Sequence, residues 1–433
     1  MSLVMDSVTK AARRSRDASL RLQSSPTEMR NKALCVIADR LHARKTAIAR
    51  ENEIDVSKAE RSGLSPALLK RLGFGEGKVE EAIDAVRSVA RLEDPVGRVL
   101  ERRELDKGFI LEKVACPIGV IGVVFESRPD ALVQISSLCV KSGNAVLLKG
   151  GSEAERTNEI LAGTISEAIT SVDEMFAGAV QLFSSRGEFQ KILSLNDLVD
   201  LIIPRGSNEL VRKIMESTSI PVLGHAAGVC HTYVDDEADL DMAVRVCYDA
   251  KVQYPAVCNA METLLVHEAV APLFLPNMAS EFAKAQVELR GDAKAREYIE
   301  AKPATKKDWG REYNDLVLNV KVVSSLEEAI DHINTYGSHH TDAIITRSEG
   351  TAKRFMDCVD SSSVMWNCST RFADGYRYGL GAEVGISTGK IHARGPVGLE
   401  GLVTYKYRIR GSGQVVADYV GPEARKFTHR KLK

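Results

Sequence analysis

The sequence has almost no net charge, no long hydrophobic run and no closely spaced cysteine pair. Its 58 Lys and Arg residues balance 59 Asp and Glu residues, which leaves a formal net charge of −1. That balance excludes a general electrostatic nucleic-acid binder, which needs excess positive charge. The longest apolar run, Val114 to Phe125, is interrupted by Pro117, Gly119 and Gly122 and is far shorter than the roughly 20 residues of a membrane helix. We therefore expect neither nucleic acid nor a membrane as a partner.

The cysteines indicate a reducing compartment. They lie at positions 35, 116, 139, 230, 247, 258, 358 and 368 and form no C-x-x-C pair. Most of them lie in apolar runs, which is typical of reduced, buried thiols and not of a disulfide framework. The first twenty residues mix basic residues with Asp6 and Asp17 and have no apolar core, so we expect no secretory signal there. These features together predict a cytoplasmic protein.

The pattern of apolar residues predicts an α/β protein. Residues 1–92 read as amphipathic helices, and from residue 117 onward buried strands alternate with helices. Such alternation predicts a doubly wound parallel sheet. The pattern divides the chain into four parts. A first α/β unit comprises residues 1–98 and 116–238, with 367–400 returning to it, and a second α/β unit comprises residues 239–366. Two extended segments occupy residues 99–115 and 401–420, and residues 421–433 form a solvated basic tail.

The usual nucleotide-binding loops are missing. No G-x-G-x-x-G follows a predicted strand, and no G-x-x-x-x-G-K-[ST] occurs. The stretch Lys149 to Ser152 nevertheless follows a buried strand and precedes a helix, at the edge of the sheet where ligands bind. Backbone N–H groups and the helix dipole favour a phosphate there. Pro204 to Asn208 has the same context, with Arg205 as a phosphate contact. A plain turn at the Lys149 loop remains equally compatible with the sequence.

No set of residues has the spacing of a metal site. His225, Cys230 and His231 are close in sequence, but Cys230 and His231 are neighbours on a predicted strand, so their side chains point to opposite faces. The adjacent His339 and His340 have the same defect if that segment is extended. We therefore expect no metal.

One cysteine differs from the others in its surroundings. Cys258 lies between Pro255, which ends a predicted helix, and a strand that begins at Thr263. It therefore lies on a loop that a scaffold can aim at a cleft, whereas Cys139 and Cys247 fall on helix faces and are expected in the core. On this ground alone Cys258 is a candidate nucleophile, and a structural role stays open.

Several motifs in fixed order resemble one family. They are Phe125-Glu-Ser-Arg-Pro129, Lys149-Gly-Gly151, Pro204-Arg-Gly-Ser-Asn208, Pro221-Val-Leu-Gly-His225, Tyr254-Pro-Ala-Val-Cys258-Asn259, Asn367-Cys-Ser-Thr-Arg-Phe372, Glu383-Val-Gly-Ile-Ser-Thr388 and Ile391-His-Ala-Arg-Gly-Pro396. Together they resemble the gamma-glutamyl phosphate reductases, a branch of the aldehyde dehydrogenase superfamily, over residues 5–420. Several long motifs in register are more specific than any one of them.

The resemblance implies a fold and a reaction. It implies a Rossmann-like cofactor domain, an α/β catalytic domain and a small β oligomerisation flap, which correspond to the first unit, the second unit and the extended segments. It implies NADPH-dependent reduction of L-glutamyl 5-phosphate to L-glutamate 5-semialdehyde with release of phosphate, the second step of proline biosynthesis. It further implies a homodimer or homotetramer, with glutamate 5-kinase as the supplier of the labile acyl phosphate.

The resemblance also assigns residues to the site. Cys258 matches the nucleophile, and Asn259 is a candidate for holding the oxyanion. The expected cofactor residues are Lys149, Gly150, Gly151, Ser152, Arg205, Gly206, Ser207 and the loosely aligned Glu312. Ser152 stands where NAD-preferring relatives carry a ribose-binding glutamate, which favours NADPH because the repulsion of a 2′-phosphate is removed.

Four further residues are expected to bind the substrate. They are Ser127, Arg128, His225 and Arg371. Arginine suits carboxylates and phosphates because it forms bidentate hydrogen bonds. The sequence leaves open that each arginine pairs with an internal carboxylate, and that His225 is structural.

Two departures from hydrolytic aldehyde dehydrogenases bear on the reaction. The stretch Glu126 to Pro129 lacks their asparagine oxyanion donor, and Pro221 to His225 lacks their general-base glutamate. A reductase of an acyl phosphate must not hydrolyse its thioester, so the loss of a water-activating base fits. The alternatives are a hydrolytic NAD(P)-dependent aldehyde dehydrogenase and a non-enzymatic binding protein of this fold. The retained Cys258 loop and Lys149 argue against the non-enzymatic protein.

Overall fold

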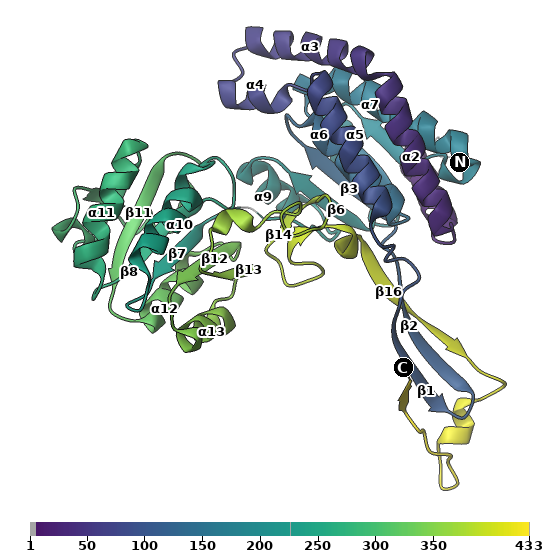
Figure 1. Ribbon diagram of the computed structural model, residues 1–433. Helices are drawn as coiled ribbons and strands as arrows, with labels where there is room; N and C mark the ends of the chain where they lie inside the picture. The colour runs from purple at the N-terminus through teal and green to yellow at the C-terminus, as the bar shows by residue number, and fades with distance from the viewer. Residues whose placement is uncertain (1–5, 226, 433) are drawn as a thin grey trace.

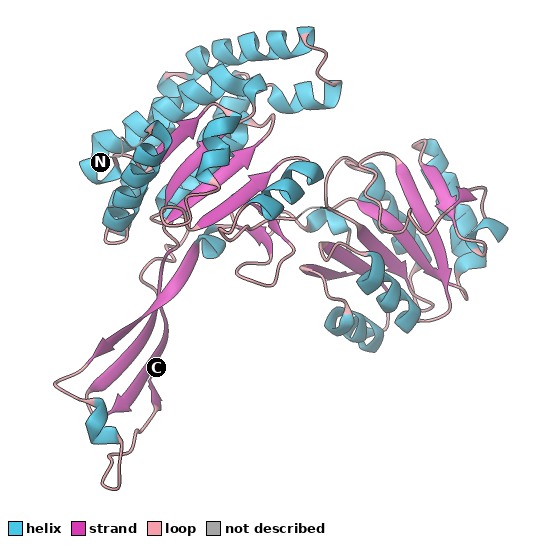
Figure 2. Cartoon of the chain, turned by 180° about the vertical axis from the view of Figure 1, so that it is seen from behind, coloured by secondary structure: helices cyan, strands magenta, loops and turns pink. Residues whose placement is uncertain are grey.

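The computed structural model describes residues 6–225 and 227–432. Residues 1–5 of the first expected unit, Ala226, and Lys433 of the expected tail lie outside this part. The chain forms two α/β regions and a long β arm that projects away from both of them (Figures 1 and 2). Among the described residues, no helix is long and apolar enough to cross a membrane.

The expected amino-terminal helices pack on one another and on the first sheet. Their bounds are α1 Ser7–Leu22, α2 Thr27–Ala43, α3 Lys45–Arg61, α4 Pro66–Leu72 and α5 Glu76–Arg91. Asp6 caps α1 by accepting hydrogen bonds from the backbone N–H groups of Val8 and Thr9. Ile37 and Leu41 of α2 meet Ile83 and Val86 of α5 in the core of this region.

The first sheet is parallel and has the strand order β5-β4-β3-β6. Its strands are β3 Val120–Phe125, β4 Ala145–Lys149, β5 Val180–Phe183 and β6 Leu201–Arg205, joined through α6 Pro129–Lys141, α7 Glu155–Val172 and α8 Arg186–Ile192. The order changes direction between β3 and β6, so the loops after these two strands border one crevice. The fold class expected from the sequence is confirmed.

The second sheet is also parallel and runs β10-β9-β11-β8-β7-β12-β13. Its strands are β7 Cys230–Val234, β8 Met261–His267, β9 Glu288–Gly291, β10 Lys302–Pro303, β11 Val317–Val323, β12 Thr341–Ile345 and β13 Ser363–Trp366. Its helices are α10 Leu240–Val252, α11 Ala271–Lys284, α12 Leu326–Tyr336 and α13 Glu349–Cys358. Helix α9, Asn208–Ser217, lies between the two sheets in sequence.

One expected boundary is wrong. The division at residue 238 assigned the strand at 230–234 to the first unit, but β7 pairs with β8 and β12 in the second sheet. A short apolar strand can be buried in either parallel sheet, and its local sequence does not reveal which neighbours it has. The short strands β9 and β10 were not foreseen either.

The arm is a four-stranded antiparallel sheet of order β16-β2-β1-β17. Its strands are β1 Val99–Asp106, β2 Phe109–Pro117, β16 Val403–Arg410 and β17 Arg430–Leu432. The expectation of a solvated tail at 421–433 is therefore wrong in part, because β17 pairs with β1. The guanidinium of Arg430 lies 2.7 Å from the carboxylate of Glu104, so β1 gives the basic end an ionic partner.

The glycine-rich stretch packs on the first region. It contains β14 Gly385–Ser387 and β15 Gly395–Val397, which pair antiparallel. Val384, Val397 and Leu399 belong to the hydrophobic core of the first region. This return brings the residues around 371–386 to the crevice.

Candidate active site

A cavity of about 760 Å³ lies where the carboxyl edge of the first sheet faces the amino edge of the second. It gathers most of the site residues expected from sequence, namely Arg128, Arg205, Gly206, Ser207, His225, Cys258, Asn259, Glu312 and Arg371. These residues come from loops far apart in the chain. The expected residues outside its lining are Ser127, Lys149, Gly150, Gly151 and Ser152.

Cys258 is half-buried on the loop between α10 and β8. Behind it, the thiol of Cys230 donates a hydrogen bond of 3.2 Å to the Cys258 carbonyl. Gly228 packs so closely that a Cβ there would lie 2.2 Å from that same carbonyl oxygen. The backbone of the loop is therefore fixed from behind, and the loop contributes Cys258 to the cavity lining.

Asn259 ties this loop to the glycine-rich stretch. Its side-chain amide donates a 2.8 Å hydrogen bond to the carbonyl of Ala373, and its own carbonyl accepts one of 2.7 Å from the Thr370 hydroxyl. One amide hydrogen is thus engaged with protein, and the oxyanion role of Asn259 stays a prediction.

The cavity is rich in arginine. Arg128 has no side-chain hydrogen bond or ion pair within residues 6–225 and 227–432, and burial, with Arg205 and Arg71 nearby, lowers its pKa. Arg371 is almost buried and donates through Nε to Gln253 at 3.0 Å. Burial, with Arg377 nearby, also lowers the pKa of Arg371. The internal pairing left open by the sequence is thus absent for Arg128 within the described part.

Sequence reasoning missed two arginines of the same cavity. Arg71 at the end of α4 donates a 2.9 Å hydrogen bond to the carbonyl of Ala256, two residues before the cysteine. Arg377 donates one of 2.8 Å to the carbonyl of Arg371. Arg71 lies on a basic helix end that resembles any solvated helix end, so no local signal distinguishes it.

Arg205 is not free for a phosphate as expected. Its guanidinium lies 3.5 Å from the carboxylate of Glu383 and donates a 3.2 Å hydrogen bond to the Glu383 carbonyl. Burial raises the pKa of Glu383. The backbone of the same loop is better placed for an anion, since Ser207 caps α9 and Gly206 precedes it.

The loops on the cofactor side interlock across the two regions. The carboxylate of Glu312 accepts a 2.5 Å hydrogen bond from the side chain of Asn208, the first residue of α9. The carboxylate of Glu126 accepts one of 3.0 Å from the backbone N–H of Ser207. A Cβ on Gly206 would lie 2.6 Å from that carboxylate.

The Lys149 loop forms a second, smaller recess on the same sheet edge. Gly150, Gly151 and Ser152 line it together with the end of β5. Lys149 is nearly buried, burial lowers its pKa, and its ammonium donates a 2.5 Å hydrogen bond to the carbonyl of Gly150. A Cβ on Gly150 would lie 2.1 Å from the side-chain nitrogen of the buried Asn158, so glycine permits this close approach.

Ser127 belongs to the lining of neither this recess nor the cysteine cavity. Its backbone N–H and hydroxyl donate hydrogen bonds of 2.6 and 2.8 Å to the carboxylate of Glu153. Its φ of +47° is a left-handed conformation that a short polar side chain tolerates. The expected contact of Ser127 with substrate is therefore not supported by its lining position.

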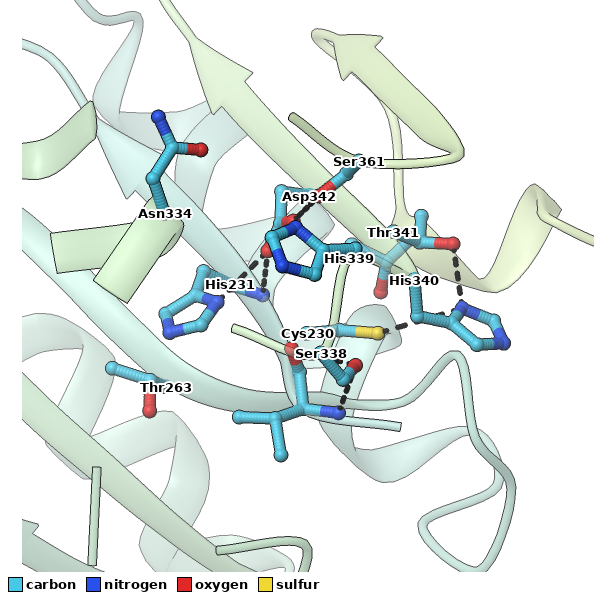
Figure 3. Close-up of polar contacts among 12 residues, drawn as sticks. Cys230, His231, Thr263, Asn334, Ser338, His339, His340, Thr341, Asp342 and Ser361 are labelled. Atoms are coloured by element: carbon cyan, nitrogen blue, oxygen red, sulfur yellow. Dashed lines mark hydrogen bonds and ion pairs between the residues drawn. The ribbon is translucent and has the colours of Figure 1, made fainter. Parts of the chain in front are cut away.

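The histidines are arranged as the strand argument requires. On β7, Cys230 faces His340, at 3.8 Å from its Nδ1, whereas His231 faces the other side and lies 2.8 Å from Asp342 (Figure 3). His225, half-buried in the cavity, shares a 3.0 Å hydrogen bond with the carbonyl of Ile386. The pairs examined in the sequence form no common metal site among the described residues, but His225 and His340 approach Cys258.

Comparison with known proteins assigns this architecture to a family. A family model described as the aldehyde dehydrogenase family matches residues 4–297. A gamma-glutamyl phosphate reductase of Pelotomaculum thermopropionicum is 57% identical over 425 residues, 98% of each chain. The same enzyme of Acetivibrio thermocellus is 53% identical over 426 residues, again 98% of each chain.

The chain belongs to the gamma-glutamyl phosphate reductase family. Membership makes it an oxidoreductase of the aldehyde dehydrogenase superfamily, as the motifs indicated. The crystal structure of the gamma-glutamyl phosphate reductase from Thermotoga maritima superposes with a TM-score of 0.92 at 40% identity, covering 95% of this chain and all of the other. The resemblance expected from the motifs is confirmed.

Proposed function

We propose that the protein reduces L-glutamyl 5-phosphate to L-glutamate 5-semialdehyde with NADPH and releases phosphate, as the second step of proline biosynthesis. The family membership supports the reaction. The observation that carries it within this chain is the position of Cys258 in a cavity lined by Arg71, Arg128 and Arg371. A thiol nucleophile surrounded by guanidinium groups suits an anionic acyl substrate, because both the phosphate and the carboxylate need a cation.

The cysteine performs the covalent chemistry. Its thiolate attacks the acyl carbon, the carbon–oxygen bond to phosphate breaks, and a thioester forms as phosphate leaves. NADPH, when bound, would supply the hydride that brings this carbon to the aldehyde level. Collapse of the resulting thiohemiacetal breaks the carbon–sulfur bond, restores the thiolate and releases the aldehyde.

The arginines divide the charged groups of the substrate. Arg128 has a guanidinium without a side-chain partner in the described part of the chain, and we assign to it the leaving phosphate. Arg371 and Arg71 are anchored by Gln253 and by the Ala256 carbonyl, so each can orient a carboxylate at fixed geometry. Backbone N–H groups beside Cys258, with Asn259, would hold the oxyanion.

The residues that face the expected cofactor fit NADPH. Gly150 packs so closely on the buried Asn158 that a Cβ would collide there, and Ser207 caps a helix whose N–H groups suit a pyrophosphate. Lys149 and Ser152 would receive the ribose and its 2′-phosphate, and Glu312 the nicotinamide ribose. The carboxylate of Glu126 accepts the hydrogen bond of the Ser207 N–H and would yield it to the cofactor.

The arm would make the oligomer. Strand β16 is an edge of its sheet, and Tyr405, Tyr407 and Ile409 on it are exposed. An open edge with exposed large side chains is suited to pairing with a second chain, as a homodimer or homotetramer. Glutamate 5-kinase would supply the labile acyl phosphate, and the free cysteines support the cytoplasm as the proposed compartment.

The reverse reaction tests the function. The protein is mixed with glutamate 5-semialdehyde and NADP, and NADPH absorbance is followed with and without inorganic phosphate. NADPH should form only with phosphate, and Cys258→Ala should lower the rate at least ~10³-fold. Cys35→Ser, which changes an exposed thiol, is the matched control and should keep the wild-type rate.

Two results would contradict the proposal. Formation of NADPH without phosphate would mean that water resolves the thioester, as in a hydrolytic dehydrogenase. Formation of no NADPH by folded protein in either condition would point to another substrate.

A further inference from the structure

Three potential metal ligands meet at the amino ends of three neighbouring strands. Cys258 precedes β8, His225 precedes β7 and His340 precedes β12, and the strand order is β8-β7-β12. The sulfur of Cys258 and one ring nitrogen of each histidine all lie within 4.8 Å of one another. Two imidazoles and a thiolate are the ligand types that Zn²⁺ prefers.

The hydrogen bond of His225 leaves its Nε2 available to bind a metal. Its Nδ1 lies 3.0 Å from the carbonyl oxygen of Ile386. A carbonyl only accepts hydrogen bonds, so Nδ1 carries the hydrogen and Nε2 keeps its lone pair. Metal-binding histidines characteristically donate their other ring N–H to a carbonyl or carboxylate in this way, which fixes the tautomer and the ring.

His340 supplies an independent sign of a ligand. It is fully buried, and its Nδ1 lies 2.9 Å from the hydroxyl of Thr341. Its Nε2 is also buried and has no hydrogen-bond partner in the described part of the chain. A buried polar atom left unpaired costs about 1–3 kcal/mol, so an unpaired nitrogen on a ring of this cluster calls for an explanation. A metal ion would satisfy it.

The spacing suits an ion with an open fourth position. Tetrahedral Zn²⁺ with bonds of about 2.0–2.3 Å holds its ligand atoms roughly 3.4–3.6 Å apart, so the three groups need only a modest approach. Cys258 is half-buried on a loop, and a water from the cavity can take the fourth position. Arg128 and Arg371 nearby oppose a dication, so we expect weaker binding than at a four-ligand structural site.

We propose that His225, Cys258 and His340 bind a thiophilic divalent cation, Zn²⁺ foremost, and that this binding reversibly blocks the active site. The thiol releases its proton as the sulfur–metal bond forms, and no oxidation or reduction takes place. The bound sulfur can no longer attack a carbonyl or react with an alkylating agent. The proposal goes beyond the reductase function, because it depends only on these three side chains.

Cobalt is the probe for binding. The full-length protein is treated with a chelator, freed of it and titrated with Co²⁺ without substrate or cofactor. We expect one Co²⁺ per chain and a thiolate-to-cobalt charge-transfer band, which Cys258→Ala abolishes. His225→Gln and His340→Gln should each weaken Co²⁺ binding at least ~10-fold. Two matched controls, Cys35→Ser and His42→Ala, change an exposed thiol and an exposed imidazole outside the cluster and should bind Co²⁺ as the wild type does.

Two outcomes would contradict the proposed metal-binding site. One is a band that persists in Cys258→Ala, and the other is a band whose titration neither histidine variant changes. His225 is half-buried and His340 is fully buried, so His225→Gln should disturb folding less than His340→Gln. The His225→Gln variant therefore keeps the test valid if His340→Gln misfolds.

Inhibition is measured separately. Zn²⁺ should slow both the reductase and the alkylation of Cys258 by iodoacetamide, and EDTA should restore both rates. A cobalt site whose occupation by Zn²⁺ leaves alkylation unchanged would overturn the blocking role. The cobalt band and the alkylation rate need no turnover, so a failure of the proposed reductase activity would leave both results interpretable.

Discussion

Lys251 and Glu262 form an ion pair of 2.7 Å in which both side chains are fully buried. They stand at the two ends of the loop that carries Cys258, one in α10 and the other in β8. The second carboxylate oxygen of Glu262 accepts hydrogen bonds of 3.2 Å from the backbone N–H groups of Tyr313 and Asn314. Burial raises the pKa of Glu262 to about 7 and lowers that of Lys251. The pair connects the cysteine loop with the segment that follows residue 312.

Breaking this pair should destabilise the protein strongly. Lys251→Met leaves the carboxyl of Glu262 buried without its cation, and we expect a loss of about 3–5 kcal/mol in the free energy of unfolding. Denaturant unfolding measures it. The double variant Lys251→Met with Glu262→Leu should recover most of the loss, because no charge is then buried. A single variant as stable as the wild type would contradict this.

Stability should fall in mild acid through His332. Burial, with the charge of His231 nearby, lowers the pKa of His332 to about 3. The unfolded chain, with a pKa near 6.5, binds the proton more readily, so stability is full above pH ~6.5 and is lost as the pH falls toward 3. This residue alone should cost about 2 kcal/mol at pH 5.

The measurement for His332 is the loss of unfolding free energy between two pH values. Unfolding free energies are determined at pH 7.5 and at pH 5 for the wild type and for His332→Gln. The variant should lose about 2 kcal/mol less than the wild type over that interval. Equal losses in the two proteins would show that His332 is not the group responsible.

Removing the charge of Glu126 should tighten cofactor binding. Its carboxylate accepts the hydrogen bond of the Ser207 N–H, at the start of α9, where we place the pyrophosphate. Glu126→Gln removes a charge that competes for a helix N-terminus, so NADPH should bind about 2- to 5-fold more tightly. Fluorescence titration with NADPH gives the dissociation constant. Glu216→Gln, an exposed change at the far end of α9, is the control and should have no effect.

A carboxylate at position 152 should reduce the preference for NADPH. Ser152 is exposed at the rim of the Lys149 recess. Ser152→Glu would place a negative charge near the 2′-phosphate, and we expect the KM for NADPH to rise about 10- to 100-fold while that for NADH changes little. The control Ser152→Gln introduces a side chain as large as glutamate but without its charge, and its KM for NADPH should resemble that of the wild type. If both variants raised the KM for NADPH equally, the size of the side chain and not its charge would be the cause.

The parts of this protein that depend on local pattern followed from the sequence. The spacing of the apolar residues indicated the helices, most of the strands and the α/β class. The loop around Cys258 was recognisable because Pro255 and the strand at Thr263 enclose it. The family motifs added the roles, since they occur in fixed order along the chain.

The placement of these parts was decided only by the tertiary structure. Pairing partners, such as β8 and β12 for β7, depend on residues far away in sequence, so the boundary at 238 was wrong. The basic end became β17 because it pairs with β1, where Arg430 meets Glu104. Arg71 lines the same cavity as Cys258 and His340 approaches Cys258, although the local sequences of α4 and of the segment before β12 are ordinary. Local sequence determines the elements, but a site made at the edges of two sheets exists only once distant segments have packed.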